Sequence, residues 1–241
     1  MRLKLVACFA LIATLLGGCV TRSISDSGYA KESYYGVKTS NNPLYKGELS
    51  EFEVLGIDPH ARVTTEEIAK AFDQKQVLKL SKGSSMMLIQ SGALIPDESM
   101  VKALEKYYNV SVFSGIPASD GSTNYSLPLR LAAAKGGFEK IVVYWGLLET
   151  AQKGLGTKAV SWVPFVGGNI RDETQEMRVR LKVAVVDVKT GQWDMFSPEP
   201  FQDTATSARY SRESSDQAQV AVLKTKAYEA AAEDLVKRYS R

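Results

Sequence analysis

A stretch of alternating residues in the C-terminal half, 177–196, constrains the fold of this chain more than any other feature. From Met177 to Val185 an apolar side chain stands at every second position, with basic side chains among the intervening ones. Such period-two alternation is typical of a strand with one buried face. Gly191 permits the positive φ that a tight reversal needs, and Trp193 begins a second alternating run. The stretch therefore predicts a β-hairpin.

The remaining elements alternate between strands and helices. We expect strands at 52–57, 85–90, 110–116 and 140–148, and helices at 64–74, 96–109, 128–135 and 215–239. The segment 151–175 is expected to be an insertion, and 197–212 mostly loop. This order predicts an α/β (α+β) fold, a layered sandwich in which helices pack on a mixed β-sheet that carries the hairpin in its C-terminal half.

The first of these helices has a sequence signal for its start. Thr64 and Glu67 have the spacing of a capping box, in which each side chain binds the other's main-chain amide. Ile68, Ala71 and Phe72 follow on one face of the expected helix. We expect this face to be buried in the core.

The N-terminus predicts a signal peptide. Arg2 and Lys4 precede an apolar run, 5–16, that is too short to span a bilayer comfortably. Without residues 1–18 and their two cations, the formal charge falls from +3 to +1. A surface so close to neutral excludes the strongly basic character typical of nucleic-acid binding. We expect a signal peptide at 1–18, a tether at 19–50 and a single periplasmic α/β domain at 51–241.

The end of the signal peptide, Leu16-Gly17-Gly18-Cys19, resembles the bacterial lipobox. The resemblance implies diacylglyceryl transfer to the Cys19 sulfur, cleavage before it and anchoring by acyl chains such as palmitate. Val20, where aspartate would favour retention at the inner membrane, implies an outer-membrane location facing the periplasm. Cys19 would be the only cysteine of the mature chain, which leaves neither a disulfide nor a cysteine nucleophile. The alternative is an ordinary signal peptide with a chance cysteine.

The strand order, the lipobox and the apolar strand that ends in Asp187-x-x-Thr190-Gly191 resemble a group of bacterial envelope lipoproteins. The group comprises the curli-secretion lipoproteins, the lipoprotein activators of penicillin-binding proteins and the N-terminal domain of TolB. The resemblance covers about 51–239 and implies a three-layer domain that binds or positions other proteins and has no catalytic site. The chain departs from the curli-secretion type because no pair of long amphipathic strands is evident.

Candidate catalytic residues are few. His60 is the only histidine, so a zinc site would depend almost entirely on carboxylates, and we expect no metal and no cofactor. Ser85 lacks the second glycine of a nucleophile elbow. The segment 154–158 lacks the order of a phosphate loop. The carboxylate pairs at 97–98 and 172–173 fit a first helical turn and a solvated loop.

The stretch 160–168 is apolar and contains Trp162, Phe165 and Val166. It is either a flap folded over the core or an exposed patch that contacts a partner, a sister subunit or the membrane. Our leading hypothesis is a non-catalytic lipoprotein, anchored through Cys19, whose domain binds an envelope protein through these three residues. The alternatives are a peptidase-like hydrolase that uses Ser85 or His60, and a homo-oligomeric export component.

Overall fold

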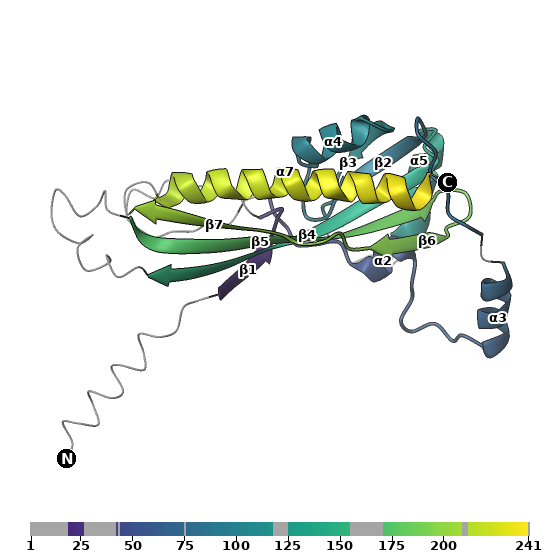
Figure 1. Ribbon diagram of the computed structural model, residues 1–241. Coiled ribbons are helices and arrows are strands. Elements are labelled where there is room, and N and C mark those ends of the chain that lie inside the picture. Colours follow the sequence, from purple (N-terminus) through teal and green to yellow (C-terminus); the bar gives the residue numbers. More distant parts are fainter. Residues whose placement is uncertain are drawn as a thin grey trace, which may run out of the picture.

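The computed structural model describes residues 19–26, 42, 44–74, 76–117, 125–154, 171–208 and 212–240. Within them, one mixed sheet of seven strands forms the middle layer and helices lie on both of its faces (Figure 1). The strands are β1 (Cys19–Ser23), β2 (Ser85–Gln90), β3 (Asn109–Phe113), β4 (Lys140–Gly154), β5 (Arg171–Asp187), β6 (Trp193–Phe196) and β7 (Phe201–Ala208). The predicted layered α+β fold is confirmed.

The sheet runs in the order β3-β2-β4-β5-β6, with β1 paired to β4 and β7 paired to β5. β2 is parallel to both β3 and β4, whereas the other pairs are antiparallel. β4 therefore lies in the centre, as its apolar run Ile141–Trp145 predicts. Met86 and Met87 of β2 are both buried, on opposite faces, which matches the expectation of a strand covered on both sides.

The helices are α2 (Glu51–Leu55), α3 (Thr65–Asp73), α4 (Glu98–Glu105), α5 (Ser126–Lys135) and α7 (Arg212–Tyr239). α4 and α7 pack on one face of the sheet, where the larger core forms. α2 and α5 pack on the other face. The predicted stripe of α7 is confirmed, and its members are all buried: Val220, Leu223, Ala227, Ala231 and Leu235.

The predicted hairpin is formed by β5 and β6. Gly191 has φ of 76°, and the Asp187 carboxylate accepts the Thr190 amide at 2.7 Å. Lys140 of β4 lies 2.9 Å from the same carboxylate. Burial would raise the pKa of Asp187, but the Thr190 and Lys140 donors outweigh it and hold that pKa below its usual value. The turn is therefore tied to the centre of the sheet.

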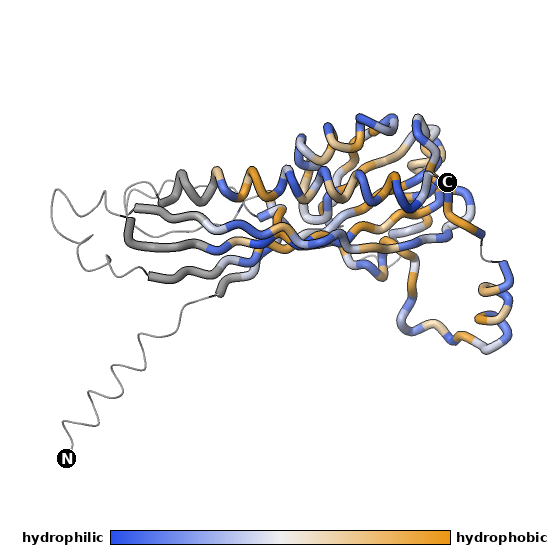
Figure 2. Tube along the Cα trace, in the orientation of Figure 1, coloured by the Kyte–Doolittle hydropathy of each residue, from blue (hydrophilic) through white to orange (hydrophobic). Residues whose placement is uncertain are grey.

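The expected insertion at 151–175 is wrong at both of its ends. β4 continues to Gly154 and β5 begins at Arg171, so the two strands pair from Lys140↔Asp187 to Gly154↔Glu173. This is a pair of long strands that the sequence analysis did not find. Residues 151–154 and 171–175 are mostly polar and show no regular alternation in the sequence. The apolar residues of the sheet gather instead in the half that carries β2, β3 and β6 (Figure 2).

Two further expectations are wrong. The segment 52–57 forms the short helix α2, not a strand, since Gly56 closes it in the left-handed region at φ 71° and acidic residues occupy its first turn. The expected loop 197–212 contains the strand β7. Its apolar pattern is weak, and its pairing with β5 stabilises it as a strand. On each of the outer strands β6 and β7, an aspartate carboxylate accepts a hydrogen bond from the next main-chain amide. Asp194 accepts from Met195, and Asp203 accepts from Thr204.

The α3 prediction is correct in position and wrong in burial. The capping box is present, with the Glu67 amide donating to Thr64 Oγ1 at 3.2 Å and the Thr64 amide donating to Glu67. None of its residues is buried, however, and Ile68 and Phe72 are strongly exposed. The helix extends away from the sheet (Figure 1), so its apolar face meets no core.

Parts of the expected tether pack on the domain. β1 pairs with β4 in the register Cys19↔Ala151 to Ser23↔Leu147. Ile24 follows β1 and is buried against Gly146, where a Cβ atom would lie 2.5 Å from its Cδ1 atom. A glycine is therefore required at this point of β4, because any side chain would displace Ile24. The chain enters the sheet at Cys19 itself.

Candidate functional site

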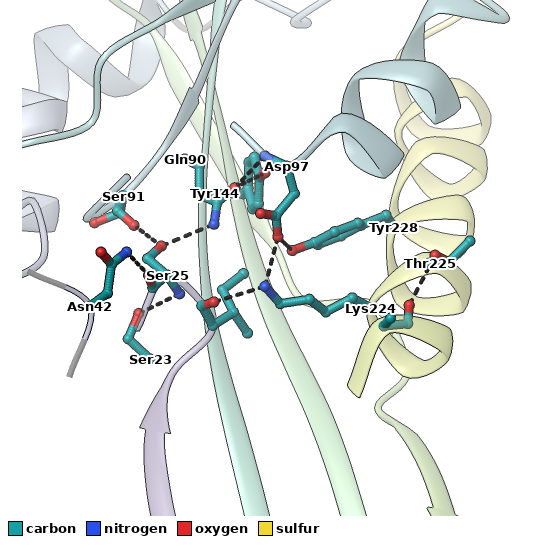
Figure 3. A network of polar contacts seen from close by, with 12 residues as sticks. Ser23, Ser25, Asn42, Gln90, Ser91, Asp97, Tyr144, Lys224, Thr225 and Tyr228 are labelled. Carbon is teal, nitrogen blue, oxygen red and sulfur yellow. Dashed lines mark hydrogen bonds and ion pairs between the residues drawn. The ribbon is translucent and has the colours of Figure 1, made fainter. Parts of the chain in front are cut away.

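A network of polar side chains lies at the carboxyl end of β2, beside the central strand (Figure 3). Ligand sites of α/β sheets lie at the carboxyl ends of parallel strands, so a functional site is expected at this position. Gln90 and Ser91 end β2, and both are buried. Tyr144 of β4 donates its hydroxyl to Gln90 Oε1 at 2.5 Å.

The segment after β1 fills this place. Ser25 Oγ donates to the Ser91 carbonyl at 2.5 Å and accepts Gln90 Nε2 at 3.0 Å. Ser91 Oγ in turn accepts the Leu49 amide at 2.7 Å. Asn42 Nδ2 donates to the Ser25 carbonyl at 3.2 Å. Residues near the N-terminus therefore occupy the position that a ligand takes in many α/β proteins.

Asp97 links the network to α7. Its Oδ2 atom lies 2.8 Å from Lys224 Nζ and also accepts the Tyr228 hydroxyl. Lys224 donates as well to the Ile24 carbonyl at 2.8 Å, and the Asp97 amide donates to Gln90 Oε1 at 2.7 Å. The Lys224 side chain is only 12% exposed, so its charge depends on Asp97 for compensation.

The two tyrosines of the network are held in their neutral forms. Burial raises the pKa of Tyr144 well above its usual value, and the nearby Asp97 charge adds to the effect. Burial likewise raises the pKa of Tyr228, with Tyr144 and Asp97 contributing. The rings meet edge to face at 5.6 Å between centroids. Both hydroxyls act as hydrogen-bond donors, and neither is prepared to act as a base.

These pKa shifts predict a loss of stability at alkaline pH. A tyrosine whose pKa is higher in the folded state contributes stability that is fully present below its unfolded pKa, near 10, and declines above it. We expect Tyr144→Phe to make this decline shallower by up to about 1.4 kcal/mol per pH unit. Urea unfolding at a series of pH values measures the slope, and equal slopes for the two proteins would contradict the assignment.

The side chains of the network are bonded to one another. Asp97 faces a cation and a tyrosine, and both Tyr144 and Ser25 are bonded to Gln90. Across the described residues, no cluster of three or more histidine, cysteine or acidic side chains is placed to hold a metal ion. The chemistry that the geometry supports is structural, because the bonds join β1, β2, α4 and α7.

A hollow of about 910 Å³ is lined by residues of β1, β4, β5 and α7 and by the segment between β6 and β7. Tyr45, Trp145, Leu147 and Arg180 are among its lining residues. Trp145 donates its indole N–H to the Leu49 carbonyl at 2.8 Å, which fixes the ring. Aromatic and arginine side chains are the types that dominate binding energy at protein interfaces.

The residues singled out in the sequence are dispersed. Cys19 begins β1, whereas Trp162, Phe165 and Val166 fall outside the described residues, as do 155–158 of the weak phosphate-loop pattern. His60 is exposed in the loop before α3. Ser85 begins β2, and no hydrogen bond joins it to His60 in the described part of the chain. Sequence reasoning missed the Asp97–Lys224–Tyr228 cluster, in which Asp97 lies 127 residues before Lys224 and 131 before Tyr228.

Comparison with known families decides where the chain belongs. The family model of the YafT bacterial lipoproteins matches residues 50–238. The chain belongs to the YafT family of bacterial lipoproteins. The matched region of this YafT chain comprises every described helix and all strands except β1. No curated protein matches it significantly.

Solved structures give only distant likenesses to this YafT chain. A PelC dodecamer from Paraburkholderia phytofirmans is 15% identical, with 65% of this chain and 93% of that one covered and a TM-score of 0.28. The hypothetical protein CT253 from Chlamydia trachomatis is 15% identical over 65% and 97% of the two chains, with a TM-score of 0.31. A putative neuraminyllactose-binding hemagglutinin homologue from Helicobacter pylori is 15% identical over 68% and 89%, with a TM-score of 0.27. Such scores carry no argument about function.

Among the described residues, no helix is both long enough and apolar enough to cross a membrane.

Proposed function

We propose that this YafT-family lipoprotein is a non-catalytic binding module, held at the outer membrane by lipid on Cys19 and facing the periplasm, that positions a protein partner. Its resemblance to the curli-secretion, penicillin-binding-protein-activator and TolB group gives the same expectation. The lipobox at 16–19 supports the anchor, and Val20 supports outer-membrane sorting.

One observation carries the proposal: the segment that follows Cys19 is built into the domain. β1 pairs with β4 directly after Cys19, and Lys224 and Ser25 hold the segment at its end. A lipid on Cys19 would therefore be attached to a rigid body and not to a long tether. Such a body holds whatever it binds at a fixed distance from the membrane.

The candidate contacts remain Trp162, Phe165 and Val166. The segment that contains them joins Gly154 to Arg171, at the end of the long strand pair. Cys19 pairs with Ala151, only three residues before Gly154. Both ends of this apolar segment therefore start close to the anchor. A partner bound there would be held near the membrane surface, within reach of the hollow lined by Tyr45 and Trp145.

Photocrosslinking in intact cells tests this function. Probes at positions 162 and 165, with Lys226 on the exposed side of α7 as the control position, would be analysed by mass spectrometry. We expect one reproducible foreign protein from the first two positions and not from the control. Crosslinks only between copies of the chain would support the oligomeric alternative instead.

The matching variant is Trp162→Ala with Phe165→Ala. We expect at least a tenfold loss of partner crosslinking from a probe at Leu147, which is exposed in the hollow, with an unchanged melting temperature. A loss of cooperative melting would instead identify the two rings as core residues and remove them from the proposed interface.

A further inference from the structure

The apolar face of α3 is left largely exposed by the described part of the chain. Ile68 is 61% exposed and Phe72 is 77% exposed, and Val77, just beyond the helix, is 82% exposed. Ile68 and Phe72 lie about one helical turn apart on the same face of α3, and Val77 follows shortly after the end of the helix. Contiguous apolar surface of this kind marks an interaction site on soluble proteins.

The helix itself needs an external contribution. Isolated helices shorter than about 12–15 residues are marginal in water, and most helices are stabilised by packing of their apolar face. α3 has nine residues and none of them is buried. Its capping box stabilises the first turn, but the capping box cannot replace the missing packing. A ligand that covers Ile68 and Phe72 would supply it.

This face forms one wall of a groove of about 780 Å³. The groove is bounded by Ile68, Ala71 and Phe72 on one side and by the hairpin turn with Trp193 on the other. Trp193 is itself 45% exposed. The groove therefore has aromatic rings on both walls, and its volume lies in the range of ligand pockets.

Gln192 holds the two walls together. Its side-chain Nε2 atom donates to the Gln74 main-chain carbonyl at 3.0 Å, and its Oε1 atom accepts a hydrogen bond from the Gln76 main-chain amide at 3.3 Å. The segment that ends α3 is thus bound to the hairpin turn by both atoms of one side chain. The groove is consequently present before any ligand arrives, which lowers the ordering cost of binding.

The groove lies far from the anchor. From Lys224, which contacts Ile24, α7 continues for 15 residues, or about 22 Å, to Tyr239. The Tyr239 carbonyl accepts the Leu80 amide, close to the groove, and Cys19 lies five strand residues, or about 16 Å, in the opposite direction. α3 and β1 are accordingly at different ends of the molecule (Figure 1).

The charges favour a basic occupant. Asp194 is the only charged residue among those that line the groove in the described part of the chain. On α3, Glu66, Glu67 and Asp73 outnumber Lys70. Interfacial helices that bind membranes carry lysine and arginine on their polar face, so an acidic helix is poorly suited to an anionic lipid surface. A basic-flanked protein segment complements both the acids and the apolar walls.

We propose that the groove between α3 and the β5–β6 turn docks an amphipathic helix of a partner protein, with apolar anchors at i, i+4 and i+7 and flanking lysines or arginines. Helix-in-groove docking uses this pattern. The surface is distinct from the segment 155–170 and does not depend on it. The lipoprotein would then hold a second protein at the end of the domain that lies away from the anchor.

The test uses the full lipidated chain in detergent and a labelled synthetic helix with leucine anchors and lysine flanks. A second peptide carries glutamate in place of each lysine. We expect fluorescence anisotropy to show at least tenfold tighter binding of the lysine peptide. Phe72→Ser should weaken it at least tenfold. Val222→Ser, which changes an apolar residue on α7 that is 48% exposed, should leave it unchanged.

Three results would overturn the proposal. The first is equal affinity for the two peptides or no binding of either. The second is a dimer in sedimentation velocity that Phe72→Ser dissociates, which would identify a second copy as the occupant. The third is a blue shift of an environment-sensitive probe at position 68 when the protein is placed in lipid nanodiscs, which would identify lipid. Gln192→Ala should weaken peptide binding while all apolar contacts remain available.

Discussion

Replacing Asp97 by asparagine is expected to lower the free energy of unfolding by about 3 kcal/mol, because breaking a buried ion pair leaves an uncompensated charge. Lys224 would keep the Ile24 carbonyl as its acceptor but lose the carboxylate 2.8 Å away. For a domain of this length the loss corresponds to roughly 6–12 °C in Tm. Urea unfolding at pH 7 and thermal melting measure the two quantities.

The control removes both charges. Asp97→Asn with Lys224→Met takes away the unpaired cation, while the asparagine oxygen still accepts the Tyr228 hydroxyl. We expect the double variant to recover at least half of the lost stability, since replacing both partners of a buried pair is often nearly neutral. A double variant less stable than Asp97→Asn would show that Lys224 acts mainly through Ile24 and not through Asp97.

The consequence extends to the N-terminus. Lys224 is the residue of α7 that holds the end of β1, and Ser25 is bonded to Gln90 and Ser91. Weakening the network should release residues 19–26 before the core unfolds. Limited proteolysis of Asp97→Asn should therefore cut near the N-terminus at a denaturant concentration where the unmodified chain remains intact.

Much of the fold could be predicted from local patterns. The hairpin at 177–196 and the stripe of α7 each bury one face against the core, so their apolar residues repeat at the period of the element, whereas β2 is buried on both faces and is marked by a continuous apolar run. The segment 52–57 forms the helix α2 and not the expected strand, because the apolar positions of so short a segment show no distinct period. The segment of β7 has the composition of a loop, because its place on the sheet depends on pairing with residues of β5 that lie 22 to 37 positions earlier.

The candidate site could not be found in the same way. Asp97, Tyr144 and Lys224 come from three separate elements, and nothing near any of them in the sequence marks the others. Ile68 and Phe72 raise the opposite difficulty, because their spacing predicts burial and the described part of the chain leaves both of them exposed. A local pattern predicts that an apolar helix face is buried, but it does not indicate whether the residues that bury it belong to the same chain.

Replacing Cys19 by serine is expected to abolish membrane anchoring. Without the thiol no diacylglyceryl group is attached, and because that step precedes cleavage, the 18-residue signal peptide should remain on the chain. Palmitate labelling and intact mass measure both effects. A variant that also carries a conventional cleavable signal should appear in the soluble periplasmic fraction, since β1 pairs through its main chain and serine preserves that pairing.

The same anchor should fix which end of the domain faces the membrane. Thr204 of β7 lies in one row with Glu176, Ala151 and Cys19 across the sheet, whereas Ser240 directly follows the end of α7. In the lipidated protein, a fluorophore at Thr204 should be quenched by headgroup-labelled lipid, and one at Ser240 should not. Equal quenching at both positions would mean that the domain lies flat on the membrane, which would bring α3 to the lipid surface. Because β1 pairs with β4 from Cys19 onward, a lipid on Cys19 would lie beside the row that contains Thr204, so we expect quenching at Thr204 alone.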